Sequence, residues 1–193
     1  MTKVLPYCEL HAHSAFSFLE GACEPETLAE RAQELALPAV ALVDRGGVYG
    51  LPRFAKACRE VGVEALAGAE VPLEDGSRLP LLVRDPRGWS NLCRLLTTAA
   101  LGRPKGQAAV SWEQVQHHAA GLLALTGWEE GPLLRAWRRG GEEAAGSLLA
   151  QLVACFGKEN LAVEVCRQLV RGEEKAIAAV VRLARRFGLP LVA

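Results

Sequence analysis

Short apolar runs alternate with segments of helical period along the 193-residue chain. The apolar runs predict a first strand ending near Glu9 and Leu10, and further strands at about 39–43, 63–70, 79–83, 121–126, 161–166 and 190–193. The periodic segments predict one helix that starts at Glu24-Pro25, one that is capped by Ser111, and helices over 51–61, 86–100 and 173–187. Two further helices are predicted within 130–156. Because strands and helices alternate, we expect β-α units around a parallel sheet.

The spacing of apolar residues also predicts which helix faces are buried. Leu35 falls on the apolar stripe of the helix that starts at Pro25, and Trp89 falls on that of the helix over 86–100. In the last helix, Ile177 and Phe187 fall on the apolar stripe, and Gly188 is placed as the C-cap.

Composition narrows the class of protein. Half of the residues are hydrophobic and 23% are charged, which is enough to bury the core of one domain or a little more and excludes a disordered tail. No apolar run approaches the ~18–20 residues that span a bilayer, and no signal peptide is recognisable, so we expect a soluble, cytoplasmic protein without membrane contact. Six dispersed cysteines predict reduced and mostly buried thiols.

The charge is balanced overall but unevenly distributed. Residues 1–70 carry 6 basic and 10 acidic side chains, whereas residues 135–193 carry 10 basic and 6 acidic ones. An acidic first third could attract cations and a basic last third could lie near nucleic acid, although ordinary surfaces often show an asymmetry of this size.

Polar residues follow the predicted strands at their carboxyl ends, where parallel β-α folds carry their working sites. His11 and His13 follow the first strand, Asp44 the second, and Glu70 ends the third. An H-x-H spacing in extended chain places both imidazoles on one face, about 6–7 Å apart, where they could share zinc, manganese or iron with a carboxylate. The alternative is a pair of surface or hydrogen-bonded histidines.

Other polar clusters have simpler interpretations. His117 and His118 are adjacent, so their side chains diverge by about 100° on a helix and are expected to face solvent or cap it. The pairs Arg138-Arg139 and Arg185-Arg186 are interpreted as solvated helix faces or helix-end charges, with phosphate contact as the alternative.

Several stretches resemble one known family. The segment YCELHAHSAFSFLEGACEPETLAERAQELALPAVALVDRGGVYGLPRFAKACREVGVEALAGAEV and the later stretches LPLLVRDPRGWSNLCRLLTTA, GLLALTGWEEGPL, NLAVEVCRQLVRGEE and LARRFGLPLVA are similar, in order, to the PHP (polymerase and histidinol phosphatase) domain at the N-terminus of bacterial DNA polymerase III alpha subunits. Replicative members usually have Asp-His-Gly where this chain has Asp44-Arg45-Gly46, so it resembles the error-prone, translesion branch more closely.

The resemblance implies an α/β fold, a distorted, TIM-like (β/α)7 barrel with up to three metal ions at the carboxyl ends of its strands. It also implies that residues 1–193 form a single PHP domain, truncated before the family's closing Asp-x-His motif. In some family members the metal cluster hydrolyses phosphoesters, and in many polymerases it is degenerate and structural.

Ligand positions carry over one by one from the resemblance. His11 and His13 match the H-x-H motif, Glu20 an acidic ligand position, and Glu70 the Gly-x-Glu motif. Arg45 stands where a histidine is expected. The other positions expected to line the site are Asp44, Arg78, which is near a further histidine position, Trp128, which is at a cysteine or histidine position, and Glu164.

The incomplete ligand set predicts little chemistry. A guanidinium a few Å from a divalent ion costs several kcal/mol, so Arg45 is expected to pair with Glu70 or Glu20. We expect at most one divalent ion, zinc or manganese, on His11, His13 and Glu70, and no confident catalytic residue.

Three functions follow from this ligand set. The first is a structural or weakly metal-binding domain of an error-prone polymerase, whose partners are the rest of the alpha subunit, DNA through that parent polymerase, and other replication or translesion subunits. The polymerase palm lies outside this sequence. The second is an active phosphoesterase, a 3′-exonuclease or pyrophosphatase, that uses a metal-bound hydroxide. The third is a freestanding remnant that binds a partner without chemistry.

Overall fold

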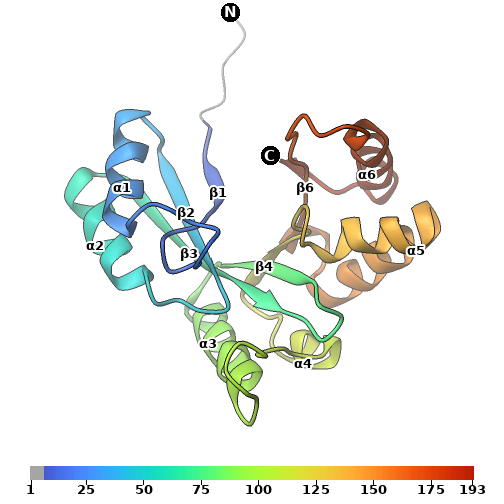
Figure 1. Ribbon diagram of the computed structural model, residues 1–193, viewed down its shortest axis with the longest axis horizontal. Helices are drawn as coiled ribbons and strands as arrows, with labels where there is room; N and C mark the ends of the chain where they lie inside the picture. The colour runs from blue at the N-terminus through green and yellow to red at the C-terminus, as the bar shows by residue number, and fades with distance from the viewer. Residues whose placement is uncertain (1–6) are drawn as a thin grey trace, which may run out of the picture. The chain divides into compact units, whose positions relative to one another are not determined.

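The computed structural model describes residues 7–193 as a mixed α/β protein. The chain divides into two compact units, Met1–Glu70 and Val71–Ala193, which are described separately below. Within the described residues, strands and helices alternate as the sequence pattern predicts (Figure 1).

The first unit is a parallel sheet covered by two helices. Strand β1 (Glu9–Ala12) pairs in parallel with β2 (Ala39–Arg45), which pairs in parallel with β3 (Glu64–Pro72). Helices α1 (Pro25–Glu34) and α2 (Leu51–Val61) pack on each other beside these strands (Figure 1). The side chains of β2 are buried from Ala39 to Asp44, as expected for a strand in the middle of a sheet.

The core of this unit forms where the apolar faces of α1 and α2 meet the sheet. Ala29, Val40, Leu42 and Phe54 are 0–3% exposed there. Ala29 on α1 and Phe54 on α2 are both fully buried in this core. This packing fixes the carboxyl ends of the three strands relative to one another.

The second unit contains the other four strands. Strand β4 (Arg78–Val83) pairs antiparallel with β5 (Leu122–Leu125), and β5, β6 (Leu161–Glu164) and β7 (Leu191–Val192) pair in parallel. The expectation of a wholly parallel sheet is therefore wrong at β4. A tight turn lies between β3 and β4, and within it Leu73 N donates a hydrogen bond to Ser77 O. Because parallel strands need a long crossover connection, a turn this short reverses the direction of the chain.

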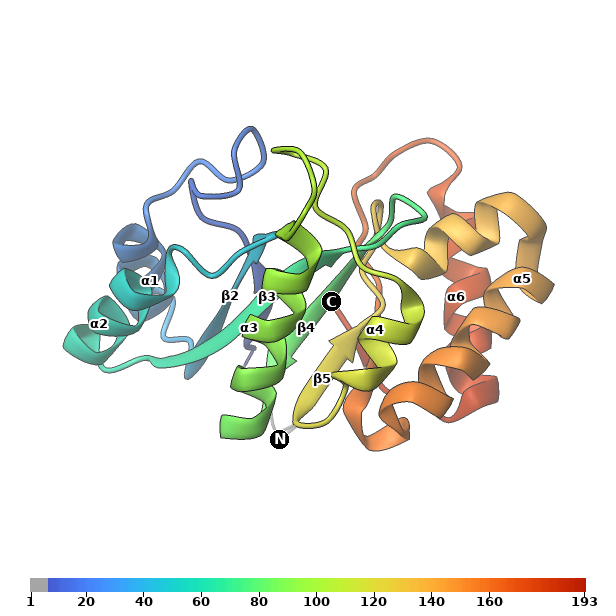
Figure 2. The same ribbon diagram turned by 90° about the horizontal axis from the view of Figure 1, so that it is seen from below.

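Four helices surround the strands of the second unit: α3 (Pro86–Ala100), α4 (Trp112–His117), α5 (Pro132–Phe156) and α6 (Glu173–Phe187). Helices α5 and α6 lie side by side (Figure 2). Helix α5 contains a kink at Gly140 and Gly141, where φ reaches +65°, so the prediction of two successive helices is confirmed.

The burial of helix faces differs in detail from the prediction. Leu35 is 54% exposed because α1 ends at Glu34, and Trp89 is 41% exposed on α3. On α6 the buried residues are Ala176, Ala179, Val180, Leu183 and Ala184, so Ile177 and Phe187 lie at the margins of the face that packs inward.

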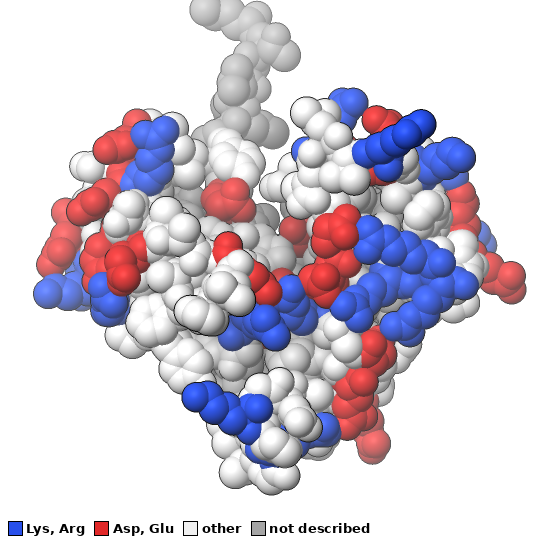
Figure 3. All heavy atoms as spheres, in the orientation of Figure 1, with Lys and Arg blue, Asp and Glu red and all other residues white. Residues whose placement is uncertain are grey.

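Arg138 on α5 belongs to an ion pair, and Arg139 on the same helix makes a hydrogen bond to the backbone. Both carboxylate oxygens of Glu129 lie 2.9 Å from Arg138 Nη2, and Arg139 donates to the backbone oxygen of Asp75. Figure 3 shows basic side chains gathered over the first half of α5, with acidic groups beside them. The interpretation of Arg138-Arg139 as a solvated helix face fits this arrangement.

All six cysteines lie in the described region as free thiols. Only Cys58 is buried, Cys23 is exposed, and the other four are intermediate, so the expectation of mostly buried thiols is wrong. None of the helices between residues 7 and 193 is both long enough and apolar enough to cross a membrane.

Candidate metal centre

The two histidines of the H-x-H motif sit at the carboxyl end of β1. His11 lies within the strand and His13 directly after it, so β1 extends further than the sequence pattern predicts. The pairing of β1 with β2 contains a register shift between Glu9 and Ala12, which is a β-bulge or similar irregularity. Such irregularities re-aim side chains near functional sites. Glu9 accepts a hydrogen bond from the backbone nitrogen of His11 at 2.9 Å, which supports the irregular segment.

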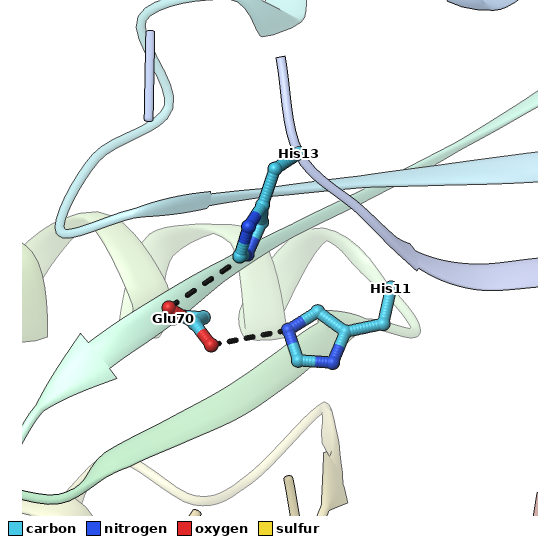
Figure 4. Close-up of side chains that lie close together, drawn as sticks. All are labelled: His11, His13 and Glu70. Atoms are coloured by element: carbon cyan, nitrogen blue, oxygen red, sulfur yellow. Dashed lines mark ion pairs between the residues drawn. The ribbon is translucent and has the colours of Figure 1, made fainter. Parts of the chain in front are cut away.

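Glu70 brings a carboxylate to the two imidazoles (Figure 4). His11 Nε2 lies 3.2 Å from Glu70 Oε1, and His13 Nε2 lies 3.7 Å from Glu70 Oε2. The ring centroids of the two histidines are 5.2 Å apart, and one ligand atom from each of the three residues lies within 4.8 Å of the others. The sequence prediction that these residues lie together is confirmed.

The group has the chemistry of a zinc or manganese site. Bonds of about 2.1 Å in a tetrahedral zinc site place neighbouring ligand atoms about 3.4 Å apart, close to the distances between Glu70 and the two rings. Burial lowers the pKa of His13, and this effect outweighs the opposing influence of Glu70, so the ring favours the neutral form that binds metals. The Nε2 atom of His13 is buried and makes no hydrogen bond with any described residue.

Glu20 and Arg45 form an ion pair next to this group. Glu20 Oε2 is 4.0 Å from His13 Nδ1, while Glu20 Oε1 accepts from Arg45 Nη1 at 3.1 Å. Arg45 and Glu70 are register partners on adjacent strands, and the backbone oxygen of Glu70 accepts from Gly46. Of the two predicted partners, Arg45 therefore pairs with Glu20, and this pairing draws the Glu20 carboxylate toward a permanent cation.

Asp44 holds the loop that follows His13. It is 2% exposed, and its carboxylate accepts from Ser14 N at 2.8 Å, from Ser14 Oγ at 2.7 Å and from Ser17 Oγ at 2.6 Å. Ser17 Oγ in turn accepts from the backbone nitrogen of Arg45. The role of Asp44 in this structure is thus to fix the loop between His13 and Glu20.

Sequence reasoning missed Ser14 and Ser17. Both are at most 1% exposed, although serine is usually a surface residue. The available signal was weak: two hydroxyls three residues apart, just after the H-x-H motif, with an aspartate ending the neighbouring strand.

Three other predicted site residues belong to the second unit. Arg78 begins β4, Trp128 is 6% exposed, and Glu164 ends β6, where its backbone nitrogen donates to Thr126 Oγ1. The buried Trp128 ring is packed as a core residue. The place of these residues at the site stays a prediction, as do the role of Glu20 in metal binding and that of Asp44 in lining the site.

The fold and the His-His-Glu group define an α/β protein with a candidate site for one divalent ion at the ends of its strands. The sequence matches the PHP domain over residues 9–168, and the chain belongs to the PHP domain family.

Curated relatives specify the branch of the family. The chain is 40% identical over 201 residues to the error-prone DNA polymerase of Mycolicibacterium paratuberculosis, and 37% identical over 205 residues to that of Anaeromyxobacter sp.. These alignments cover 98% and 99% of this chain but 18% and 17% of the relatives. The chain thus spans about a fifth of their length, and the resemblance to the error-prone branch is confirmed.

Solved structures support the fold. An amidohydrolase from Chromobacterium violaceum superposes with a TM-score of 0.62 at 19% identity, covering 95% of this chain and 84% of its own. A protein from Bifidobacterium adolescentis, described as a candidate metal-dependent phosphoesterase, gives 0.61 at 17% identity, covering 95% and 85%. The predicted fold class is confirmed, and at these identities the likeness concerns the fold alone.

Proposed function

We propose that this chain is the N-terminal PHP domain of an error-prone DNA polymerase and that it has a structural or weakly metal-binding role there. The relatives named error-prone DNA polymerase support the setting. The partners we propose are the remainder of that polymerase, DNA through the polymerase, and other replication or translesion subunits.

The ion pair between Arg45 and Glu20 carries the proposal for the site. A metal cluster needs several anionic or neutral ligands around each ion. Here His11, His13 and Glu70 supply one set of three, while the next carboxylate is bound to a guanidinium that cannot lose its charge. A second divalent ion beside Glu20 would have to overcome that charge, so one ion, zinc or manganese, is the most that this group would hold.

The test combines metal analysis with activity assays on the purified chain. Elemental analysis after dialysis against zinc or manganese measures the ions bound per chain, and phosphatase, pyrophosphatase and 3′-exonuclease assays measure turnover. We expect at most one ion per chain and no turnover above that of the His13→Ala variant. His117→Ala is the matched control, because His117 is an exposed histidine on α4.

The outcomes separate the proposals. Loss of the metal in His13→Ala but not in His117→Ala, without turnover in either, supports a weakly metal-binding domain. Turnover that depends on stoichiometric metal and vanishes in His13→Ala contradicts it.

An active phosphoesterase is the second candidate. Three protein ligands would leave the fourth position of a tetrahedral zinc ion open, as in catalytic zinc sites, and a bound ion would polarise a phosphoryl oxygen there. His11, His13 and Glu70 would hold the ion. The same assays decide between the two candidates.

A further inference from the structure

A second cluster of polar side chains lies in the second unit, between α3 and α4. It forms a pocket of about 390 Å³ and shares no residue with the His-His-Glu group. Its lining consists of Arg87, Ser90, Asn91, Arg94, His117 and His118.

The lining is cationic and lacks carboxylates. Arg87 and Arg94 are exposed and form no ion pair with any described residue, unlike Arg103, which pairs with Glu74 at 2.7 Å. They are seven residues apart on α3, so they lie on one face of the helix, about 10.5 Å apart along its axis. Two guanidinium groups without counter-charges, facing one pocket, attract an anion.

The neighbouring side chains add polar groups in a fixed geometry. His118 Nδ1 lies 2.9 Å from the backbone oxygen of Gln114, so this nitrogen donates and the ring orientation is set. The rings of His117 and His118 are 5.2 Å apart, and Ser90 brings a hydroxyl to the same wall as the arginines. A hydroxyl beside two guanidinium groups suits an oxyanion with several acceptor oxygens.

The walls of the pocket are held together by the backbone. Asn91 is 8% exposed, and its Nδ2 donates to Ala120 O at 2.8 Å, which ties α3 to the segment after α4. Gly88 and Gly121 are in close approach, since a Cβ on Gly88 would lie 1.9 Å from Gly121 O. The two arginines are therefore carried on a helix whose position is fixed before a ligand arrives, which lowers the entropic cost of binding.

We propose that the pocket lined by Arg87 and Arg94 binds a phosphate group. The planar guanidinium fork matches the oxygens of phosphate, and the two forks on one helix face can engage one phosphate each or share one. The phosphate can come from a small phosphate ester or from the backbone of a nucleic acid. This site goes beyond the function proposed above and does not depend on metal binding.

The experiment measures binding of inorganic phosphate and pyrophosphate by calorimetry, and of a labelled single-stranded oligonucleotide by anisotropy, at about 50 mM salt. The test variant is Arg87→Ala/Arg94→Ala, which we expect to weaken binding by at least about tenfold. Arg185→Ala/Arg186→Ala is the matched control: it removes the same charge from exposed positions on α6 and should bind as the wild type does.

A third variant, Arg87→Lys/Arg94→Lys, keeps the charge and removes the forks. We expect its affinity to fall between those of the wild type and the alanine variant. Two results together would show that the phosphate comes from a nucleic acid. The oligonucleotide would bind more tightly than pyrophosphate. The slope of its log affinity against log salt concentration would also be shallower in the alanine variant, by the amount expected for about two phosphate contacts. If the small anions bind equally well, the source is a small phosphate ester.

Two results overturn the proposal. One is the absence of binding of every probe up to about 10 mM. The other is equal weakening in the test variant and in the Arg185→Ala/Arg186→Ala control, which would indicate attraction by net charge alone.

Discussion

Arg45 is the residue that limits the candidate metal centre. Its guanidinium pairs with Glu20, and its backbone lies in register with Glu70. Replacing Arg45 with histidine removes a permanent cation, breaks its ion pair with Glu20 and adds a metal ligand. We expect Arg45→His to bind zinc at least about tenfold more tightly, or to bind more than one ion per chain.

Competition with a chelator and elemental analysis measure this change. Arg53→His is the matched control, because it also breaks ion pairs, those with Glu24 and Glu26, while His11, His13 and Glu70 are unchanged. If the two variants gain metal equally, or neither does, Arg45 does not limit the site.

Asp44 is expected to matter for stability more than for metal binding. Asp44→Ala leaves Ser14 and Ser17 as buried donors without their acceptor. Such a loss costs about 3 kcal/mol of unfolding free energy, measurable by urea denaturation. Asp85→Ala is the comparison, because Asp85 also accepts a hydrogen bond, from Gly88 N, as the exposed N-cap of α3, and we expect it to cost about 1 kcal/mol. Equal costs would contradict this role.

The central residues of the site could be predicted from the sequence. Alternation along a strand places His11 and His13 together, and the ends of parallel strands bring Glu70 to them. Ser14 and Ser17 could not be predicted, because a hydroxyl in a loop carries no sign of the buried carboxylate it will contact. The places of Arg78 and Trp128 at the site come from the family resemblance and stay predictions.

At the scale of elements, the approach of α3 to the segment before β5 depends on two glycines. A Cβ at Gly88 would lie 1.9 Å from Gly121 O, whereas a Cβ at Gly146 on α5 would lie 3.7 Å from Leu183. We therefore expect Gly88→Ala to destabilise the protein by more than about 2 kcal/mol, because backbone atoms must move.

Gly146→Ala provides the control for this prediction. Alanine at Gly146 should stabilise the helix by about 0.5–1 kcal/mol. Thermal unfolding of the two variants measures both effects, and a stable Gly88→Ala variant would show that the two segments can separate at little cost.

Helix boundaries could be predicted where a proline marks the first turn of a helix or a glycine marks its end. Helices α2, α3 and α6 have the predicted bounds, with Pro52 and Pro86 in the first turns of α2 and α3 and Gly62 and Gly188 in left-handed conformations at the ends of α2 and α6. The apolar pattern of β4 does not set its direction, but the connection before it is too short for a parallel crossover, so its reversal could have been predicted from the length of that turn. The buried face of α6 was only partly predicted because it depends on how α5 packs against it.

For the whole molecule, the zero net charge is the sum of opposite net charges on the two units. Residues 1–70, the first unit, carry 6 basic and 10 acidic side chains, a net charge of −4, and residues 71–193 carry 16 basic and 12 acidic ones, a net charge of +4. The candidate metal group thus belongs to the acidic unit and the proposed phosphate pocket to the basic one. Each ligand is favoured by the charge of the unit that would bind it.

This division predicts self-association at low salt. With no net charge to keep copies apart, the acidic unit of one molecule attracts the basic unit of another when the Debye length is about 30 Å, near 0.01 M salt, and much less when it is about 8 Å, near 0.15 M. Light scattering near pH 7 should therefore detect oligomers at the lower salt concentration that dissociate at the higher one. Arg185→Glu/Arg186→Glu brings the second unit to zero charge and should stay monomeric at both. Association of this variant equal to that of the wild type would assign the contact to apolar surface instead of charge.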